Sequence, residues 1–450
     1  MIADIIIENA LILTLDADSR TFAAGTIAIK GRDIAAIGHA DEFGGWQAGR
    51  RIDGRNVLAM PGLVNVHNHS PLMITRGMIE DLGYAPAYTP GIPQGHHLDE
   101  DDAYALASLG LYELLRCGST TVVDYYRYPE AMARAAGELG LRAVIGGRIH
   151  DADPAALAEG RFEHSPAIGR ASIEETVRLI ERWNGHAGRI RCDWAPHAAD
   201  TCSADLLREV AGLAKAGNIH THLAQSRAEV ERVRARDGLS PAELLDATGL
   251  LEARTIAAHC IWLEPHDVAR VGRAGATVAH APIGNAKSGT VAPILELERS
   301  GARIALCTDT FSGDLFEAMR WACAMQRIRQ DGFQPDAARV LRWATRSGAG
   351  ALGMSEEIGS LSVGSRADIV LLDRTSPLLA PVIDGIGIVV HTAGAAAVDT
   401  VIVDGRIVIE SGRLANGRGP EIVRRAQAVA EKLWRNAGYG AIVTQPPSAR

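Results

Sequence analysis

The middle of the chain alternates short apolar runs with amphipathic segments, and this alternation constrains the fold more than any other feature. Eight runs have the apolar, β-branched texture of buried strands, at residues 63–67, 120–125, 142–149, 190–195, 218–223, 255–260, 276–280 and 303–308. The segments between them carry apolar residues at helical spacing, as at residues 101–116, 130–139, 173–183, 204–216 and 315–329. Buried strands that alternate with helices predict an all-parallel sheet, and eight such units predict a (β/α)8 barrel of the TIM type.

The competing α/β architecture is a doubly wound sheet, which would place a glycine-rich phosphate turn after its first strand. The first strand here ends instead in His67-Asn68-His69. We therefore predict that residues 60–359 form the barrel.

The two ends of the chain differ from the middle. Short β-rich runs separated by turn residues lie near both ends, at residues 4–7, 10–14, 26–29, 33–38, 368–372, 398–403 and 406–409. Asp404-Gly405 separates the last two runs as a hairpin turn. We expect residues 1–59 and 360–415 to build one small β-sandwich domain together. Residues 416–450 are predicted to form a C-terminal helix and a tail.

Charge and hydropathy exclude two classes of partner. The 450-residue chain has a formal net charge of −8, and its arginines are scattered without forming a patch, so we expect no nucleic acid partner. Its longest apolar region, residues 383–403, is interrupted by Asp384, His391 and Asp399, so we expect no membrane-spanning helix. Residues 1–4 lack the basic region of a signal peptide, and we expect a cytoplasmic protein. We also expect a homo-oligomer, either a dimer or a larger assembly.

The six cysteines show neither C-x-x-C spacing nor the density of a disulfide scaffold. We expect most of them to be small core residues.

Histidines and one aspartate recur at the C-terminal ends of the predicted strands, where barrels carry their functional residues. His67 and His69 alternate along the first strand and would project to the same side, so they could bind one metal ion. The later strands contribute His197, His220, His222, His259, His280 and Asp309. Two or three imidazoles and one carboxylate leave an open position on a Zn²⁺-like ion, which is a catalytic arrangement. That position would hold a water with a near-neutral pKa.

On these motifs the chain resembles the amidohydrolase superfamily, and more narrowly its branch of triazine hydrolases, S-adenosylhomocysteine deaminases and cytosine deaminases. The resemblance runs nearly end to end. The motifs fall in the family's order: Pro61-Gly62-Leu63-Val64-Asn65-Val66-His67-Asn68-His69, Ala195-Pro196-His197, His220-Thr221-His222-Leu223-Ala224, Ala258-His259-Cys260, His280-Ala281-Pro282-Ile283-Gly284-Asn285, Thr308-Asp309 and the closing segment 359–368.

The resemblance implies one divalent metal ion, with Zn²⁺ as the first choice and Fe²⁺ as the second. Its implied ligands are His67, His69, His222 and Asp309. His220 shares a strand face with His222 and stays open as an alternative ligand. Binuclear relatives often bridge two metals with a modified lysine near the end of the fourth strand. The lysines of this chain are Lys30, Lys215, Lys287 and Lys432, none at that place, so we expect one metal.

The resemblance also implies roles around the metal. Asp309 would act as a catalytic base as well as a ligand, and His259 would orient the water or the substrate. In some dechlorinating relatives the residue equivalent to His259 ligates the metal itself. His197 and Asn285 match positions near the substrate.

The chain departs from the branch at Gln225. Relatives usually have a glutamate there, which shuttles a proton from the metal-activated water to a ring nitrogen. A carboxamide can form hydrogen bonds but cannot carry that proton. Gln225 is therefore a candidate catalytic residue that either replaces the shuttle in another way or only binds substrate.

A second departure is the loop at residues 81–98, which is rich in proline, glycine and aromatic residues. It could be an ordinary rigid loop or a wall of the substrate pocket. In the second case Tyr84, Tyr88, His96 or His97 would meet the substrate, and we favour Tyr88 and His97.

The leading hypothesis is a metal-dependent hydrolase that cleaves a C–N bond of a small nitrogen heterocycle, most simply an aminohydrolase that releases ammonia. The alternative is hydrolysis of an exocyclic amide, urea, carbamate or halide group, for which Asp309 alone would move the proton. A third reading is a relative that has lost catalysis. Such a protein would be expected to lose metal ligands, and here all four are present.

Overall fold

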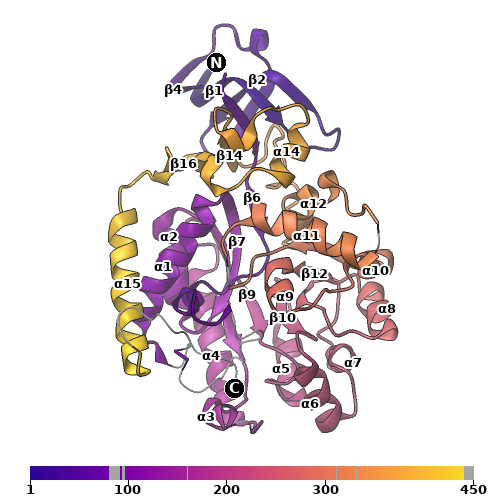
Figure 1. The fold of residues 1–450 in the computed structure, drawn as a ribbon. Helices are drawn as coiled ribbons and strands as arrows, with labels where there is room; N and C mark the ends of the chain where they lie inside the picture. The colour runs from indigo at the N-terminus through magenta and orange to yellow at the C-terminus, as the bar shows by residue number, and fades with distance from the viewer. Residues whose placement is uncertain (81–91, 94–96, 160, 311, 331, 440–450) are drawn as a thin grey trace.

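The computed structural model describes residues 1–80, 92–93, 97–159, 161–310, 312–330 and 332–439. Its centre is a sheet of eight parallel strands that follow one another in chain order (Figure 1). They are β6 (Leu63–Asn65), β7 (Ser119–Tyr126), β8 (Arg142–Ile149), β9 (Ile190–Pro196), β10 (Ile219–Leu223), β11 (Thr255–His259), β12 (Thr277–His280) and β13 (Arg303–Leu306).

Backbone hydrogen bonds join the first strand to the last. The Val66 N–H donates to the Leu306 carbonyl at 3.4 Å, and the Asp309 N–H donates to the His67 carbonyl at 3.1 Å. The predicted TIM-type barrel is therefore confirmed. The barrel strands are apolar throughout because the interior and the outer helices bury both of their faces; every residue of β7 and β8 is buried.

Helices surround the barrel, and several begin at a Ser or Asp side chain that accepts a hydrogen bond from the first turn. Such caps are Asp99, Asp153, Ser203, Ser226, Ser240 and Asp336. The helices between β6 and β13 are α1 (Glu100–Arg116), α2 (Pro129–Leu139), α3 (Pro154–Ala158), α4 (Pro166–Trp183), α5 (Ala204–Leu213), α6 (Arg227–Asp237), α7 (Pro241–Ala247), α8 (Pro265–Arg273), α9 (Pro282–Lys287) and α10 (Ile294–Arg299). After the barrel follow α11 (Leu315–Gln330), α12 (Ala337–Trp343), α13 (Arg346–Ala351) and α14 (Gly385–His391).

Segments from the N-terminal and C-terminal parts of the chain form a second sheet, above the barrel in Figure 1. Its nine strands are β1 (Ile2–Leu13), β2 (Thr21–Lys30), β3 (Asp33–His39), β4 (Gln47–Asp53), β5 (Val57–Pro61), β14 (Ile369–Asp373), β15 (Val398–Val403), β16 (Arg406–Glu410) and β17 (Arg413–Leu414). Antiparallel pairing of β5 with β14 joins the two ends, which confirms the predicted composite β domain. The domain limits remain a prediction.

Two details of this sheet depend on backbone conformation. The runs expected at residues 4–7 and 10–14 form one strand, β1. Asn9 has a φ of 59° and the register with β2 shifts at this point, but the strand continues through it as a β-bulge. At the predicted hairpin, Asp404 and Gly405 have φ values of 53° and 75°, as a type I′ turn requires.

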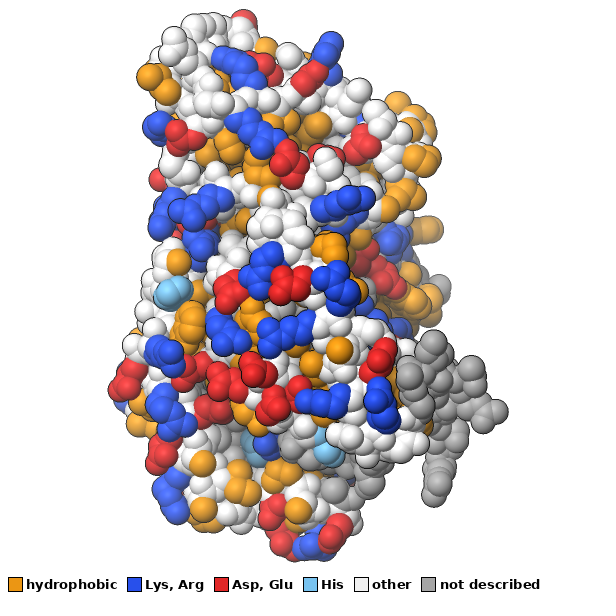
Figure 2. All heavy atoms as spheres, turned by 90° about the vertical axis from the view of Figure 1, so that its left-hand side faces the viewer, with side chains coloured by type: hydrophobic (Ala, Val, Ile, Leu, Met, Phe, Trp, Pro, Cys, Tyr) orange, Lys and Arg blue, Asp and Glu red, His pale blue; other side chains and the backbone are white. Residues whose placement is uncertain are grey.

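The C-terminal helix α15 (Gly419–Asn436) packs along the outside of the barrel beside α1. Lys and Arg side chains are interspersed with Asp and Glu side chains on the face shown in Figure 2. Lys432 forms an ion pair with Asp102 of α1 (2.5 Å), and Arg418, directly before α15, forms one with Glu138 of α2 (2.8 Å). No described helix is long and apolar enough to cross a bilayer. All six cysteines are buried with free thiols, as expected.

A buried ion pair ties the barrel to the second sheet. Arg142, the first residue of β8, places Nε 3.0 Å from Asp368 and its guanidinium also contacts Asp404 at 3.3 Å. All three side chains are at most 3% exposed. A charge buried this deeply depends on its partners, because water cannot replace them.

Replacing Asp368 with alanine is therefore expected to lower the free energy of unfolding by about 3–5 kcal/mol. Asp33→Ala is the matched control, because its ion pair with Arg366 is partly exposed to solvent, with side-chain exposures of 47% and 31%, and its loss should cost less than about 1 kcal/mol. Urea denaturation of both variants measures the difference. Equal losses in the two variants would contradict the anchoring role of Arg142.

Candidate metal centre

The structure brings the four predicted ligands together at the C-terminal mouth of the barrel. His67 and His69 follow β6, His222 lies on β10, and Asp309 follows β13. His69 Nε2 lies 3.1 Å from His222 Nε2, and Asp309 Oδ1 lies 3.6 Å from His67 Nε2 and 3.7 Å from His69 Nε2. All four side chains are buried.

Local hydrogen bonds fix the strand ends that carry these ligands. Asn65 donates from Nδ2 to Thr308 Oγ1 at 2.6 Å, so the ends of β6 and β13 cannot move independently. Asp309 itself adopts a φ of 58°, a conformation that residues other than glycine rarely take. Strain of this kind persists where the surrounding structure imposes it, commonly at functional sites.

Two of the histidines are held in the tautomer that a metal requires. His69 donates from Nδ1 to the Tyr125 carbonyl at 2.6 Å, and His222 donates from Nδ1 to the His197 carbonyl at 2.7 Å. A neutral imidazole that donates from Nδ1 carries its lone pair on Nε2. Both Nε2 atoms therefore present lone pairs to the same point.

This donor set fits a Zn²⁺-like ion. Bonds of 2.0–2.1 Å in a tetrahedron place neighbouring donor atoms about 3.3 Å apart. The separations of 3.1 to 3.7 Å lie around that value. In addition, His67 Nε2 is buried and has no hydrogen-bond partner in the described parts of the chain, which a metal bond would remedy.

The protonation states also suit metal binding, since ligands must be deprotonated. Burial and the neighbouring His67 lower the pKa of His69 to about 3, and burial lowers the pKa of His222 well below its usual value. Burial alone would raise the pKa of Asp309, but the neighbouring His67, whose Nε2 lies 3.6 Å from Asp309 Oδ1, and the nearby His259 lower it below the usual range. At neutral pH the imidazoles of His69 and His222 are therefore neutral and Asp309 is a carboxylate.

His259 stands beside the ligands. Its Nε2 lies 3.9 Å from Asp309 Oδ2, and its Nδ1 contacts Asn285 Oδ1 at 3.2 Å. The amide oxygen can only accept, so Nδ1 carries the proton and Nε2 faces the carboxylate unprotonated. His67, His222 and His259 could also form a metal-binding group of their own.

The alternative ligand His220 lies deeper in the barrel. Its Nε2 forms a 2.9 Å hydrogen bond with Asp193 on β9. His222, two residues further along β10, is the one that contacts His69. The geometry thus places His222 in the donor set and gives His220 a partner elsewhere.

The remaining predicted site residues differ in position. His197 follows β9, with its ring centroid 4.7 Å from that of His222 and its Nδ1 2.7 Å from Thr201 Oγ1. Gln225 is half-buried on the loop after β10. His97 is exposed just before α1. Tyr84, Tyr88 and His96 lie outside the described residues.

Sequence reasoning missed Tyr125, the penultimate residue of β7. Its carbonyl accepts the proton of His69, and its hydroxyl lies 3.1 Å from His222 Nδ1. A tyrosine in a strand is common in any β protein, so residue type carried no signal. Its place at the C-terminal end of a barrel strand could have marked it.

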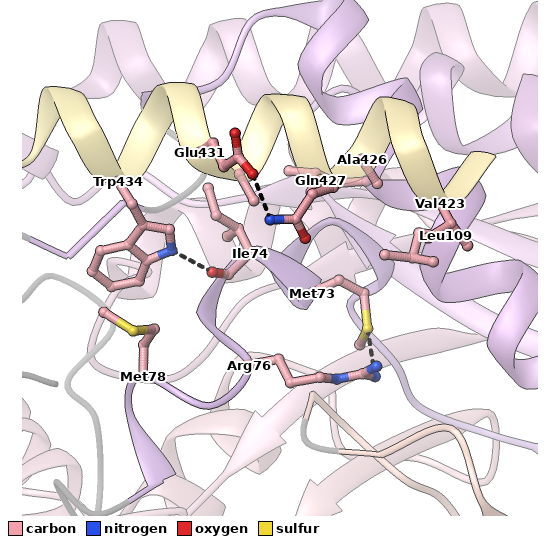
Figure 3. Close-up of a pocket in the computed structure, with 12 residues that line it drawn as sticks. Met73, Ile74, Arg76, Met78, Leu109, Val423, Ala426, Gln427, Glu431 and Trp434 are labelled. Atoms are coloured by element: carbon pink, nitrogen blue, oxygen red, sulfur yellow. Dashed lines mark hydrogen bonds between the residues drawn. The ribbon is translucent and has the colours of Figure 1, made fainter. Parts of the chain in front are cut away.

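The segment after His69 is braced from outside. The short helix η2 (Ser70–Thr75) follows this ligand directly, and Trp434 of α15 donates from Nε1 to the Ile74 carbonyl at 2.7 Å (Figure 3). A groove of about 460 Å³ lies beside this contact, between η2, α1 and α15. The C-terminal helix is thereby hydrogen-bonded to the segment that follows His69.

Known proteins resemble the chain over nearly its whole length. The sequence profile of the amidohydrolase family matches residues 58–408. A 5-methylthioadenosine/S-adenosylhomocysteine deaminase of Pelotomaculum thermopropionicum is 34% identical over 442 residues, which cover 96% of this chain and 99% of the relative. A 5′-deoxyadenosine deaminase of Methanosarcina mazei is 33% identical over 443 residues, with coverages of 96% and 98%.

Solved structures show the same architecture. An adenosine deaminase of Xanthomonas campestris with bound zinc matches with a TM-score of 0.85 and 25% identity, covering 96% of this chain and 99% of that one. A zinc complex of atrazine chlorohydrolase from Arthrobacter aurescens matches with a TM-score of 0.83 at 24% identity, covering 95% and 100%. The second likeness concerns the fold alone.

Proposed function

The chain belongs to the amidohydrolase family, as a metal-dependent hydrolase of carbon–nitrogen bonds outside peptides, and we propose that it removes the exocyclic amino group from the adenine ring of a 5′-modified nucleoside. One observation carries the proposal: a buried cluster of three imidazoles and one carboxylate, in which His69 Nε2 lies 3.1 Å from His222 Nε2 and Asp309 Oδ1 lies 3.6 and 3.7 Å from His67 and His69, within a chain that matches nucleoside deaminases over 96% of its length. Zn²⁺ held by His67, His69, His222 and Asp309 would supply a water of near-neutral pKa as nucleophile.

Asp309 is the proposed base. Its Oδ1 faces His67 and His69, whereas its Oδ2 faces His259. One oxygen can therefore serve the metal while the other accepts the proton of the attacking water. Its lowered pKa keeps the carboxylate ionised before the reaction begins.

His259 is the proposed orienting residue. Asn285 fixes its ring through Nδ1, and burial lowers its pKa to about 4, so its Nε2 is an acceptor at neutral pH. It can accept a hydrogen bond from the attacking water or from Asp309 once that group is protonated. The rigid ring thereby limits the directions in which the proton can move.

Two more side chains are proposed to contact the substrate. His197 Nδ1 lies 3.4 Å from Arg148 Nη2, and because a guanidinium only donates, Nδ1 is an acceptor and Nε2 carries the N–H that can donate to a ring nitrogen. Asn285 Nδ2 is buried without a hydrogen-bond partner among the described residues and could donate to a leaving or ring group. Tyr88 and His97 remain proposed contributors to the pocket wall.

The substrate proposal is tested by ammonia release from the zinc-loaded protein. One panel holds adenosine, 5′-deoxyadenosine, 5′-methylthioadenosine and S-adenosylhomocysteine; the other holds cytosine, pterins, triazines, amides and ureas. We expect turnover on the first panel and preference for a 5′-modified member. Turnover confined to the second panel would contradict the substrate proposal while leaving the metal centre intact.

The amide side chain of Gln225, in place of the usual glutamate, is the observation that favours a second candidate function. Deamination of a ring needs a proton on the ring nitrogen as water adds, and a positioned proton donor contributes about 10²–10⁴-fold to such a step. A substrate with a readily departing amide, urea, carbamate or halide group needs less ring protonation. For an adenine substrate, Asp309 and His259 must deliver the proton without a glutamate.

We expect Gln225→Glu to leave kcat/KM on the native substrate unimproved, because the site is arranged around an amide. Steady-state kinetics of this variant on both substrate panels measure the effect. The only increase that we expect is in the weak deamination of other aminated heterocycles. A gain in native kcat/KM of about tenfold or more would show that the amide is a defect in an ordinary deaminase site.

A further inference from the structure

The loop that carries Gln225 is held by a buried carboxylate one helical turn further along the chain. Glu229, on α6, is only 3% exposed. Its Oε1 accepts from the Ala224 N–H at 2.9 Å and its Oε2 accepts from the Gln225 N–H at 2.7 Å. Both oxygens of the carboxylate are thus bonded to the backbone of this loop, which begins directly after β10 and its residue His222.

The backbone held in this way is strained and is bonded to the next catalytic loop. Ala224 has a φ of 49°, which costs energy in a residue with a Cβ. Its carbonyl accepts from the N–H groups of Ile261 at 3.2 Å and Trp262 at 2.9 Å. Those residues follow His259, which is itself in the left-handed region at a φ of 73°. One carboxylate therefore supports the turns that carry Gln225 and His259.

The surroundings of Glu229 make an ordinary capping role an incomplete explanation. Burial and the neighbouring Asp200 raise the pKa of Glu229 above its usual value, whereas the backbone hydrogen bonds from Gln225 and Ala224 favour its ionised form. Asp200 lies on the loop after His197 and forms a 3.1 Å ion pair with Arg232. Groups kept at an energetic cost between catalytic loops commonly serve function.

We propose that Glu229 is a positioning residue: its carboxylate holds Ala224 and Gln225, and through the Ala224 carbonyl it holds the turn after His259, so that both side chains keep one geometry toward the substrate. The consequence for turnover rests on the proposed function. The consequence for the two loops does not.

The test compares Glu229→Gln with Glu243→Gln in the zinc-loaded full-length protein. Glu243 forms the same kind of contact on α7, where it accepts from the Ser240 N–H at 2.9 Å. Each substitution replaces one acceptor oxygen by a donor at nearly constant volume. The readouts are bound zinc, kcat and KM, and hydrogen exchange of the backbone amides at residues 224–225 and 260–262.

We expect Glu229→Gln to retain zinc, to accelerate exchange in both loops, and to lower kcat by about 10²-fold with KM changed by less than about threefold, because misplacement by about 1 Å can have that effect. Glu243→Gln should alter exchange only around α7 and change kcat by less than about twofold. A kcat of Glu229→Gln within about twofold of wild type would overturn the proposal. Unchanged exchange at residues 260–262 would overturn the link to His259.

If Glu229→Gln does not fold or bind zinc, Ala224→Gly decides. Glycine tolerates the positive φ and also permits other conformations, so it loosens the loop while the carboxylate stays in place. Faster exchange at Gln225 with a fall in kcat supports the proposal, and no change in either contradicts it. If the wild-type protein releases no ammonia from nucleosides, the substrate proposal fails. The hydrogen-exchange data still test whether Glu229 holds the two loops. In that case kcat is measured on whichever substrate of the second panel reacts.

Discussion

Asp309→Asn is expected to lower kcat by about 10³-fold or more while the barrel stays folded. The amide is nearly the same size as the carboxylate but cannot take a proton from water at neutral pH. It also weakens the anionic part of the ligand set formed with His67 and His69. Steady-state ammonia release measures the loss, and circular dichroism with bound-metal analysis checks that the fold persists.

Asp314→Asn is the matched control for this prediction. Asp314 lies on the same loop and accepts from the Phe316 N–H at 2.8 Å at the start of α11. Asparagine caps a helix about as well as aspartate does, so kcat should change by less than about twofold. Near-normal turnover by Asp309→Asn, with a substrate confirmed for the wild type, would refute the role of Asp309 as base.

His222→Ala is expected to lower zinc affinity by more than about 10²-fold and to abolish turnover. Removing a residue that only hydrogen-bonds to a metal ligand can already lower metal affinity by up to about 10²-fold. The Nε2 of this residue is one of the two lone pairs that meet 3.1 Å apart, so its loss removes a donor from the set. His69→Ala should behave alike. Metal analysis after dialysis against zinc-free buffer measures the loss.

His220→Ala separates the two histidines of β10. Its imidazole is bonded to Asp193, so we expect lower stability and retained zinc. Loss of zinc in His220→Ala together with retention in His222→Ala would reverse the assignment. This pair of variants therefore distinguishes a ligand from a histidine that supports the barrel interior.

Much of this architecture could be predicted from the sequence, because the alternation of strands and helices is visible in short stretches of sequence. In addition, the functional residues of a barrel directly follow the C-terminal ends of its strands. His67 and His69 alternate on one strand, and Asp309 follows the last apolar run. Once the strands close into a barrel, their ends must meet, and the structure places Asp309 Oδ1 3.6 Å from His67 Nε2 and 3.7 Å from His69 Nε2.

Depth within the barrel could not be predicted from the pattern. His220 and His222 share a strand face, and a period of two does not say which one reaches the mouth. The capping pattern of Ser226 and Glu229 is visible in the sequence. That the Glu229 carboxylate also holds Ala224, and that Ala224 holds the turn after His259, depends on how neighbouring loops pack.

Titration of metal-free protein with Zn²⁺ tests the central claim most directly. The protein is stripped with a chelator, and ammonia release from the preferred nucleoside is followed as zinc is added. The geometry of one shared donor set predicts no activity without metal and a linear rise that ends at about one equivalent per chain. Full activity in the stripped protein, or a rise that continues to about two equivalents, would contradict a single metal centre built from His67, His69, His222 and Asp309.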